Sequence, residues 1–561
     1  MSPAQNPAQN PAQNPAQNPA QNPDQNPAQS LVQVTDLVVD FGETRAVDRL
    51  SFTLEKGAAL GLVGESGSGK STVASALLGL HRGTGAHVGG EVRVGGIDVQ
   101  EASGEELRRL RGGKAAMVFQ DPLSSLDPYY AVGDQIAEVY RVHTGASRRA
   151  ARARAVDVLD RVGIPDAVRR ARSRPHEFSG GMRQRALIAM ALACEPELLI
   201  ADEPTTALDV TVQAQILDLL HVLRAETGMG LLLVTHDVGV AAESVDDVLV
   251  MRYGRAVERG PVREILGAPR EAYTKELLGA VPRVDSPREA AAPARGDVVL
   301  EAVDLRKEFG RGKRAFAAVD GVSLTVRRGE TLGIVGESGS GKTTLGRMLV
   351  GLLDPSAGEI RHEGASAPGG GVRAGVQMVF QDPVSSLNPR RGIGESIADP
   401  LRARGERDDA AVRARVRDLM ERVGLDPAYY GRYPHEFSGG QRQRVGIARA
   451  LAAEPRVIVC DEPVSALDVT TQAQVTALLA ELQEEHGLAL VFIAHDLAVV
   501  RQVSDRVAVM RTGRIVEHGT VDEVYGSPRQ AYTRQLLAAV PALDPEAAAR
   551  RRTARRELAA A

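Results

Sequence analysis

The chain has 561 residues, a length that predicts two or more domains rather than a single hydrophobic core. A formal net charge of −4 disfavours general nucleic-acid binding, which usually needs a basic surface. The composition, 43% hydrophobic, is globular, but no apolar stretch reaches the roughly 20 residues of a membrane helix and no secretory signal opens the chain, so any membrane contact should be peripheral.

The first predicted element is a Pro-Ala-Gln-Asn repeat over residues 1–29, which has almost no apolar side chain to bury and should be disordered. Beyond it the apolar runs predict strands that alternate with helices. Strands are expected at 59–63, 198–201 and 231–234, and helices at 184–192 and 212–223. This alternation indicates an α/β fold with a parallel sheet, whose ligand site lies beyond the carboxyl ends of the strands.

The rest of the chain is a tandem duplication of one domain-sized unit. The repeated segments are GESGSGKS (64–71) and GESGSGKT (336–343), FQDPLSSLDP (119–128) and FQDPVSSLNP (380–389), FSGGM (178–182) and FSGGQ (437–441), ADEP (201–204) and CDEP (460–463), THD (235–237) and AHD (494–496), and AYTKELLGAVP (272–282) and AYTRQLLAAVP (531–541). The predicted domains are 30–282 and 298–541, with a linker at 283–297 and a basic tail at 542–561. We expect the arginine-rich tail to form a solvated helix, with a membrane-surface contact as the alternative.

Each half carries the pattern G-x-x-x-x-G-K-[ST] directly after a predicted strand. The glycines let the backbone N–H groups face a polyphosphate, the lysine neutralises the β- and γ-phosphates, and the following hydroxyl holds Mg²⁺. Two copies in the same context exclude a chance glycine loop. The predicted ATP-binding residues are Gly64, Glu65, Ser66, Gly67, Ser68, Gly69, Lys70, Ser71 and Thr72 in the first half, and Gly336, Glu337, Ser338, Gly339, Ser340, Gly341, Lys342, Thr343 and Thr344 in the second.

An Asp-Glu pair follows a buried strand in each half, as Asp202 with Glu203 and as Asp461 with Glu462. Adjacent acids at such a place are unfavourable unless a metal ion or hydrogen bonds compensate them. We expect each aspartate to face Mg²⁺ and each glutamate to act on the attacking water of phosphoryl transfer. An acidic turn before the following proline is the alternative, and the nearby glycine loop disfavours it.

With these motifs the chain resembles the ATP-binding-cassette family of P-loop NTPases, over nearly all of residues 31–541. The resemblance implies two tandem cassettes, each with a mostly parallel sheet and a helical subdomain, that sandwich ATP between them. FSGGM and FSGGQ resemble the signature motif, which in that family completes the ATP site of the opposite domain. The pairings implied are Ser179, Gly180 and Gly181 with Lys342, and Ser438, Gly439 and Gly440 with Lys70. The one difference, Met182 against Gln441, should remove a polar contact at the Lys342 site.

The resemblance assigns further roles to residues that occupy the same place in both halves. In the family, a Q-loop glutamine lies near Mg²⁺ and the membrane partner, a switch histidine bonds the γ-phosphate, a D-loop aspartate crosses the interface, and an aromatic ring stacks on adenine. The matching positions are, in that order, Gln120 and Gln381, His236 and His495, Asp209 and Asp468, and Phe41 and Phe309. A core position is the alternative for the two phenylalanines.

The segments FQDP-x-SSL-x-P, PHEFSGG and AYT-x-x-LL-x-AVP resemble importers of dipeptides, oligopeptides, glutathione and nickel. This resemblance implies an ATPase at the cytoplasmic face of the membrane, working with two integral-membrane permease subunits and an extracytoplasmic solute-binding protein. The permease should bind around the Gln120 and Gln381 loops, where Leu126 and Leu387 are expected to line a shallow pocket. Some relatives carry late cysteines for an iron–sulfur cluster; this chain has none there, so no cluster is expected.

Two other classes of two-cassette protein are the alternatives. One is an exporter motor, and the other is a soluble ATPase that acts in translation or DNA repair. A translation factor of that kind has a long charged helical linker, whereas this linker spans 15 residues. A repair ATPase would carry zinc cysteines or long inserted coiled coils, which the sequence lacks. These differences favour the importer and no nucleic-acid partner.

Overall fold

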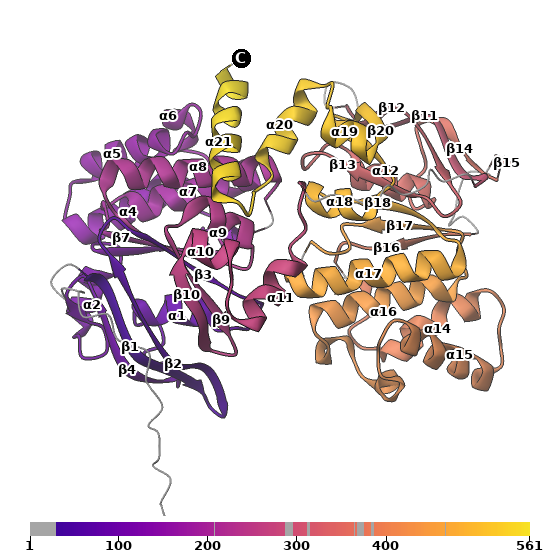
Figure 1. Ribbon diagram of the computed structural model, residues 1–561. Helices are drawn as coiled ribbons and strands as arrows, with labels where there is room; N and C mark the ends of the chain where they lie inside the picture. Colours follow the sequence, from indigo (N-terminus) through magenta and orange to yellow (C-terminus); the bar gives the residue numbers. More distant parts are fainter. Residues whose placement is uncertain are drawn as a thin grey trace, which may run out of the picture.

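The computed structural model describes residues 30–206, 208–285, 296–310, 315–363, 365–366, 375–382, 386–465 and 467–560. The predicted disordered repeat and residues 286–295 of the predicted linker lie outside the described residues. Two α/β domains, here called cassette 1 and cassette 2, follow one another along the chain (Figure 1). Within the described ranges, no helix is long and apolar enough to cross a membrane.

Cassette 1 has a four-stranded antiparallel sheet in the order β2-β1-β4-β5 and a six-stranded sheet in the order β10-β9-β3-β8-β7-β6. Its strands are β1 (Ser30–Phe41), β2 (Thr44–Glu55), β3 (Ala59–Val63), β4 (His87–Val94), β5 (Ile97–Asp98), β6 (Ala115–Val118), β7 (Leu198–Asp202), β8 (Gly230–Thr235), β9 (Asp247–Arg252) and β10 (Arg255–Pro261). Its helices are α1 (Lys70–Leu77), α2 (Gly104–Leu110), α3 (Pro122–Ser125), α4 (Val132–Thr144), α5 (Arg148–Arg161), α6 (Ala167–Arg170), α7 (Gly180–Leu192), α8 (Val210–Thr227), α9 (Val238–Ser244), α10 (Val262–Gly267) and α11 (Ala272–Ala280).

Cassette 2 repeats this architecture, with sheets in the orders β12-β11-β14-β15 and β16-β17-β18-β13-β19-β20. Its strands are β11 (Val298–Phe309), β12 (Phe316–Arg327), β13 (Thr331–Val335), β14 (Ala357–His362), β15 (Ala365–Ser366), β16 (Val376–Val379), β17 (Val457–Asp461), β18 (Ala489–Ile493), β19 (Arg506–Arg511) and β20 (Arg514–Thr520). Its helices are α12 (Lys342–Leu349), α14 (Ile393–Ala403), α15 (Asp409–Arg422), α16 (Gly439–Ala452), α17 (Val469–His486), α18 (Leu497–Val503), α19 (Val521–Gly526), α20 (Ala531–Ala539) and α21 (Pro545–Ala560).

The predicted parallel sheet is confirmed in both cassettes. In cassette 1, β3 pairs in parallel with β8 and β9, and β7 pairs in parallel with β6 and β8. Every residue of β3, β7 and β8 is buried, as expected for continuous apolar strands covered on both faces. Because parallel strands end at one edge, the motifs that follow β3, β7 and β8 meet there.

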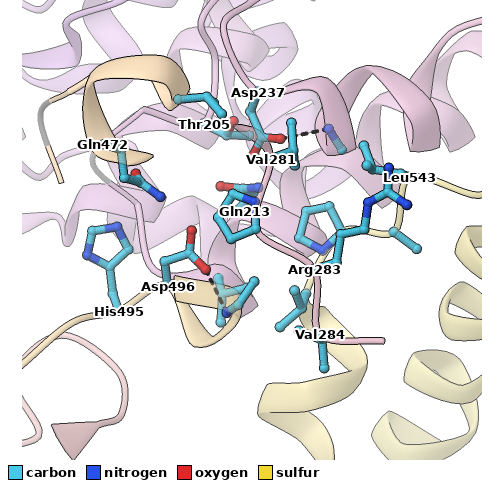
Figure 2. A pocket seen from close by; sticks show the side chains of 18 of the residues that line it. Thr205, Gln213, Asp237, Val281, Arg283, Val284, Gln472, His495, Asp496 and Leu543 are labelled. Carbon is cyan, nitrogen blue, oxygen red and sulfur yellow. Dashed lines mark hydrogen bonds between the residues drawn. The ribbon is translucent and has the colours of Figure 1, made fainter. Parts of the chain in front are cut away.

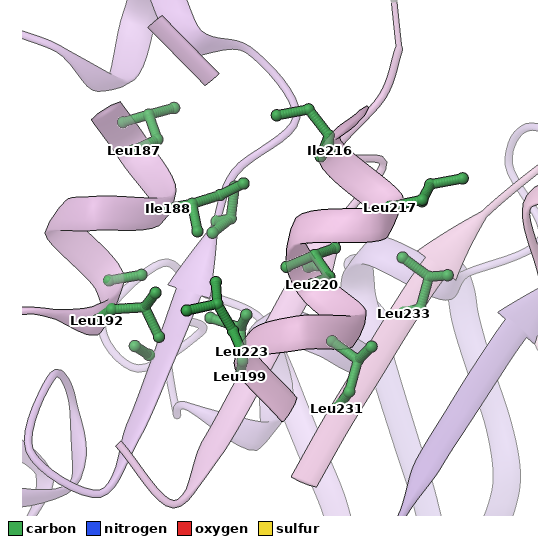
Figure 3. Packing of buried hydrophobic residues seen from close by; sticks show 14 of the residues in the cluster. Leu187, Ile188, Leu192, Leu199, Ile216, Leu217, Leu220, Leu223, Leu231 and Leu233 are labelled. Carbon is green, nitrogen blue, oxygen red and sulfur yellow. The ribbon is translucent and has the colours of Figure 1, made fainter. Parts of the chain in front are cut away.

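Helices α7 and α8 cover the strands with apolar side chains. Figure 3 shows Leu187, Ile188 and Leu192 of α7 and Leu220 and Leu223 of α8 packed over the sheet in one buried cluster. Full burial of each such side chain stabilises the fold by about 1.5–3 kcal/mol. Both helices begin a few residues before the predicted starts, because polar cap residues precede their apolar faces.

The two cassettes touch through helices from the ends of their domains. Helix α11 of cassette 1 packs on α17 of cassette 2, while α20 of cassette 2 packs on α8 of cassette 1 (Figure 1). The two contacts are therefore equivalent under the internal duplication. Helix α21 adds a third contact, with α9 of cassette 1, that has no counterpart from cassette 1 within the described residues.

The basic tail is not the solvated helix that we expected. Its helix α21 docks on cassette 1, where the Arg555 guanidinium, 10% exposed, pairs with Asp218 at 3.0 Å and Glu243 at 3.4 Å. Arg551 pairs with Asp285 at 2.7 Å. The expectation of a solvated helix was wrong because the partner acids of Arg555 lie 337 and 312 residues away in the sequence, where composition gives no sign of them.

A buried histidine close to the contact between α21 and cassette 1 predicts that acid lowers the stability of the fold. His221 Nε2 lies 2.6 Å from the Glu243 carbonyl oxygen, and burial, reinforced by the charge of Arg552, lowers the pKa of His221. A lowered histidine pKa means that stability is fully present above the ordinary value of about 6.5 and is lost as the pH falls below it. Between about pH 7 and pH 5.5 the melting temperature of the wild type should fall further than that of His221→Gln. Calorimetry of the nucleotide-free proteins checks this, and equal falls would contradict it.

Candidate functional site

The glycine-rich loop of each cassette joins a buried strand to a helix, and its first and last glycines leave no room for a side chain. A Cβ at Gly64 would lie 2.2 Å from the Met251 carbonyl oxygen. Gly69 has a φ of +97°, and its Cβ would lie 2.4 Å from a β2 carbonyl oxygen. Gly336 and Gly341 are equally confined, each with a carbonyl oxygen at 2.2 Å. These positions accept only glycine, which allows both the left-handed backbone and the close approach.

A buried lysine lies at the centre of each loop. The hydrogen bonds run from Lys70 Nζ to the carbonyl oxygens of Gly64 and Glu65, both at 2.8 Å, and from Lys342 Nζ to those of Gly336 and Glu337, at 2.6 and 2.9 Å. Burial lowers the pKa of both lysines, and the surrounding carboxylates oppose that shift. A desolvated ammonium group of this kind pairs strongly with an anion such as a phosphate.

Two of the three predicted magnesium ligands are adjacent in each cassette, whereas the third, Gln120 or Gln381, bonds to the neighbouring glutamate. Ser71 Oγ donates to Asp202 Oδ1 at 3.0 Å, and Thr343 Oγ1 donates to Asp461 Oδ1 at 3.0 Å. Burial raises the pKa of both aspartates. One hydroxyl and one carboxylate oxygen beside the glycine loop fit Mg²⁺, which prefers oxygen ligands, one or two carboxylates and substrate phosphates.

Each glutamate after the aspartate belongs to a hydrogen-bonded trio with the predicted glutamine and histidine. In cassette 1, Gln120 Nε2 donates to Glu203 Oε2 at 2.9 Å, and His236 Nδ1 lies 3.0 Å from Glu203 Oε1. In cassette 2 the corresponding distances to the Glu462 carboxylate are 2.7 Å from Gln381 and 3.3 Å from His495. The parallel sheet thus brings three predicted catalytic residues together in each half.

The glutamates remain ionised despite their burial. Burial alone would raise the pKa of Glu203 and lower that of His236, but their hydrogen bond and opposite charges outweigh it. The pKa of the glutamate therefore lies below its ordinary value and that of the histidine above it, and Glu462 with His495 behaves alike. An ionised carboxylate is what a general base requires.

Both glutamates also have an unusual backbone, which no sequence motif indicated. Glu203 has a φ of +46° and Glu462 a φ of +47°, in the left-handed region that non-glycine residues seldom adopt. Such a conformation costs on the order of 1–3 kcal/mol and persists where the surrounding structure enforces it. The same conformation recurs at the equivalent residue of both cassettes, beside the hydrogen-bonded trio.

The signature serines cap the helices that follow them. Ser179 Oγ accepts the Met182 N–H, and Ser438 Oγ accepts the Gln441 N–H, both at 3.3 Å. The Gln441 side chain is engaged by its own cap, since its Oε1 accepts the Ser438 N–H at 3.0 Å. The expectation that Met182 lacks a nucleotide contact made by Gln441 stays a prediction. Among the hydrogen bonds of the described residues, none joins a signature serine to the other cassette.

The D-loop of cassette 1 contacts the glycine loop of cassette 2. Asp209 Oδ1 accepts the backbone N–H of Ser338 at 2.6 Å, and Thr211 Oγ1 donates to Glu337 Oε1 at 2.7 Å. On the other side, Asp468 caps its own helix α17, and its charge raises the pKa of Lys70 against the larger effect of burial. Asp209 thus lies at the domain interface, and the interface position of Asp468 stays a prediction. Thr211 belongs to none of the motifs that indicated the site.

The two predicted adenine-stacking residues are exposed rings rather than core residues. Phe41 and Phe309 end β1 and β11 and are 42% and 37% exposed. Phe41 meets the ring of His81 edge-on at 5.4 Å, whereas Phe309 stacks on Phe316 at 5.8 Å. Neither His81 nor Phe316 belongs to a repeated motif, so the sequence offered no signal for them. Exposed aromatic faces suit stacking with a base.

A cavity of about 700 Å³ lies between the cassettes. Figure 2 shows Thr205 and Asp237 of cassette 1 across from Gln472, His495 and Asp496 of cassette 2. The lining also includes the Ala-Val-Pro segments and the start of α21. One interdomain space therefore adjoins the catalytic residues of both halves.

The leucines predicted to face a permease are core residues. Leu126 is 2% exposed and Leu387 is 3% exposed, and each belongs to the main hydrophobic cluster of its cassette. The expectation that these leucines line a shallow pocket for a permease was therefore wrong. The turn directs the leucine inward and leaves other residues on the surface, among them Tyr129, which is 79% exposed.

Known protein families match the two cassettes in which these residues lie. The pattern described as "ABC transporter" matches residues 47–206 and 319–465, one stretch in each cassette. The pattern described as "Oligopeptide/dipeptide transporter, C-terminal region" matches residues 257–311 and 516–561. Each cassette is thus a transporter-type ATPase domain followed by its own C-terminal extension.

The chain is 47% identical to the glutathione import ATP-binding protein GsiA of Shigella sonnei over 546 residues, which cover 89% of this chain and 87% of that protein. The GsiA proteins of Salmonella paratyphi A and Salmonella typhi are also 47% identical, over 542 residues with the same coverage. The chain therefore belongs to the ABC transporter family, as an ATP-hydrolysing subunit with two cassettes in one polypeptide.

Proposed function

We propose that the protein hydrolyses MgATP at two sites between its cassettes and thereby drives the import of glutathione or a related small peptide. The observation that carries this proposal is the complete catalytic set in each cassette: a loop lysine, a hydroxyl–aspartate pair, and the trio of glutamate, histidine and glutamine. The similarity to glutathione import proteins supports the class of solute.

Each group in the site has a distinct task. The loop amides and Lys70 receive the phosphates, and the oxygens of Ser71 and Asp202 hold Mg²⁺, which when bound neutralises charge on the β- and γ-phosphates. Glu203 polarises the attacking water, while His236 holds the carboxylate in place and bonds the γ-phosphate. The same tasks fall to Lys342, Thr343, Asp461, Glu462 and His495 in cassette 2.

Closure of the cassettes completes both sites. We propose that ATP draws Ser179 and its two following glycines onto the phosphates at Lys342, and the Ser438 group onto those at Lys70. The N-termini of α7 and α16 then direct unpaired N–H groups at the γ-phosphate. The D-loop contact of Asp209 with Ser338 supports this pairing of opposite halves.

We further propose that the protein binds two integral-membrane permeases at the cytoplasmic face of the membrane, with a solute-binding protein on the other side. Surface residues near the Q-loops, such as the exposed Tyr129 and Tyr130, suit contact with a permease helix. Uptake of glutathione and of a dipeptide into proteoliposomes that contain the permeases, with and without ATP, tests the choice of solute.

Both sites are expected to hydrolyse ATP, since neither cassette has lost a catalytic residue. Glu203→Gln and Glu462→Gln, each made alone in the assembled transporter, should retain single-turnover hydrolysis at the untouched site. Single-turnover conditions separate the chemical step from coupling between the sites. If one variant is inactive in the first turnover and the other is unaffected, only one site is catalytic and the proposal of two is wrong.

A further inference from the structure

One repeated motif has no part in the site described so far. The sequence Ala-Tyr-Thr opens α11 and α20, the helices that follow the last strand of each cassette. Its tyrosines, Tyr273 and Tyr532, are buried although both belong to short helices near the domain interface. A buried tyrosine usually has a specific partner for its hydroxyl group.

That partner is the glycine loop of the same cassette. The Tyr273 hydroxyl accepts the backbone N–H of Glu65 at 3.4 Å, and the Tyr532 hydroxyl accepts that of Glu337 at 3.1 Å. Glu65 and Glu337 each follow the first glycine of their loop. The same long-range contact is thus made twice, over separations of 208 and 195 residues.

The tyrosines are held in fixed orientations. The Arg252 guanidinium lies 4.3 Å from the Tyr273 ring centre, and that of Arg511 lies 4.7 Å from the Tyr532 ring centre. The start of α20 is anchored by Glu517, whose carboxylate accepts the backbone N–H groups of residues 529 and 530 at 2.7 and 3.1 Å. Burial raises the pKa of Tyr532 to about 12, so its hydroxyl stays protonated near neutral pH.

The same loop residue is held from the opposite cassette as well. The carboxylate of Glu337 accepts a hydrogen bond from Thr211 at 2.7 Å, in the first turn of α8. Helix α20, which carries Tyr532, packs on α8. Glu337 is therefore bound through its backbone by its own cassette and through its side chain by the other.

We propose that Tyr273 and Tyr532 are positioning residues for ATP. Each bonds the second residue of its glycine loop to helix α11 or α20, and so maintains the loop conformation that receives the phosphates. Loss of the hydroxyl frees one loop amide and lets the loop sample other conformations. Nucleotide binding must then order the loop again, which weakens affinity. The proposal rests on the assignment of the glycine loops as nucleotide sites.

Titration of purified full-length protein with MgADP tests this one site at a time. Tyr532→Phe is examined in a Lys70→Ala background, where only the cassette 2 loop binds, and Tyr273→Phe in a Lys342→Ala background. Removal of one neutral hydrogen bond should raise the Kd for MgADP by about 3- to 10-fold in each case. In proteins that retain both lysines, KM for ATP should rise by a similar factor with kcat nearly unchanged.

The matched control is Tyr525→Phe, which removes a buried hydroxyl that donates to the Leu497 carbonyl oxygen at 2.7 Å, away from the loop. It should lower the melting temperature and leave the MgADP affinity unaltered. A lower melting temperature with unchanged Kd in both Tyr273→Phe and Tyr532→Phe would overturn the proposal, because it would show a structural role alone. A different result would overturn the assignment of the glycine loops as nucleotide sites: MgADP would still bind to the protein that carries both Lys70→Ala and Lys342→Ala.

Discussion

Replacement of both Glu203 and Glu462 by glutamine should leave ATP binding intact and slow hydrolysis by at least about 10²-fold. The amide has the shape of the carboxylate and can still meet Gln120 and His236, but it cannot polarise the attacking water. Because hydrolysis no longer follows binding, the protein should accumulate with its cassettes closed on ATP. Steady-state hydrolysis, MgATP titration and the compactness of the ATP-bound protein in small-angle scattering check the three expectations.

A matched control makes the same glutamate-to-glutamine change at positions outside the site. Glu138 and Glu421 are exposed acids on helices of the two cassettes, and their double change to glutamine should leave hydrolysis within about 2-fold of wild type. Normal turnover in the Glu203→Gln, Glu462→Gln protein would show that neither glutamate acts on water, and the catalytic assignment would then be withdrawn.

A charge at Leu126 or Leu387 should destabilise the fold of the cassette that carries it. Leu126→Asp removes a buried leucine, a loss of about 2–5 kcal/mol for such truncations, and leaves a carboxylate without a partner in an apolar cluster. We expect the melting transition of that cassette to fall by about 10 °C or the cassette not to fold. Thermal unfolding followed by calorimetry measures this directly.

The control for that experiment is a charge at a nearby exposed residue. Tyr129→Asp adds the same carboxylate three residues away on the surface and should shift the melting temperature by less than about 2 °C. If Leu126→Asp melts like Tyr129→Asp, the leucine is not part of the core and the original expectation of a surface pocket regains its basis.

The pattern of apolar residues along the chain was sufficient to predict the parallel sheet. The apolar run at 59–63 is strand β3 in full, and the runs at 198–201 and 231–234 are β7 and β8 to within one residue. A strand buried on both faces is continuous in hydrophobicity, so its limits are marked by the polar motifs that follow it. Helix starts were less certain, because a cap residue such as Ser179 is polar and lies outside the apolar repeat.

The residues that meet around Glu203 and Glu462 could also be predicted, because the chemistry of phosphate and magnesium needs particular residue types at short spacings. The partners that act over long sequence distances could not. Tyr273 meets Glu65 across 208 residues, and Arg555 meets Asp218 across 337. Such contacts cannot be recognised from the local sequence, because the sequence of the tail is the same whether its arginines face water or an acidic side chain.

The sequence by itself determined the duplication, the parallel sheets and the identity of the loop lysines, acids and histidines, since each follows from local periodicity or from a short motif with one chemical use. Only the tertiary structure decided which side of a turn Leu126 occupies, that Asp209 and Thr211 bond to the glycine loop of cassette 2, and that helix α21 binds cassette 1. These outcomes depend on which surfaces meet when the chain packs, and the free energy of packing is set by all the neighbours of a residue together, few of which are close to it in the sequence.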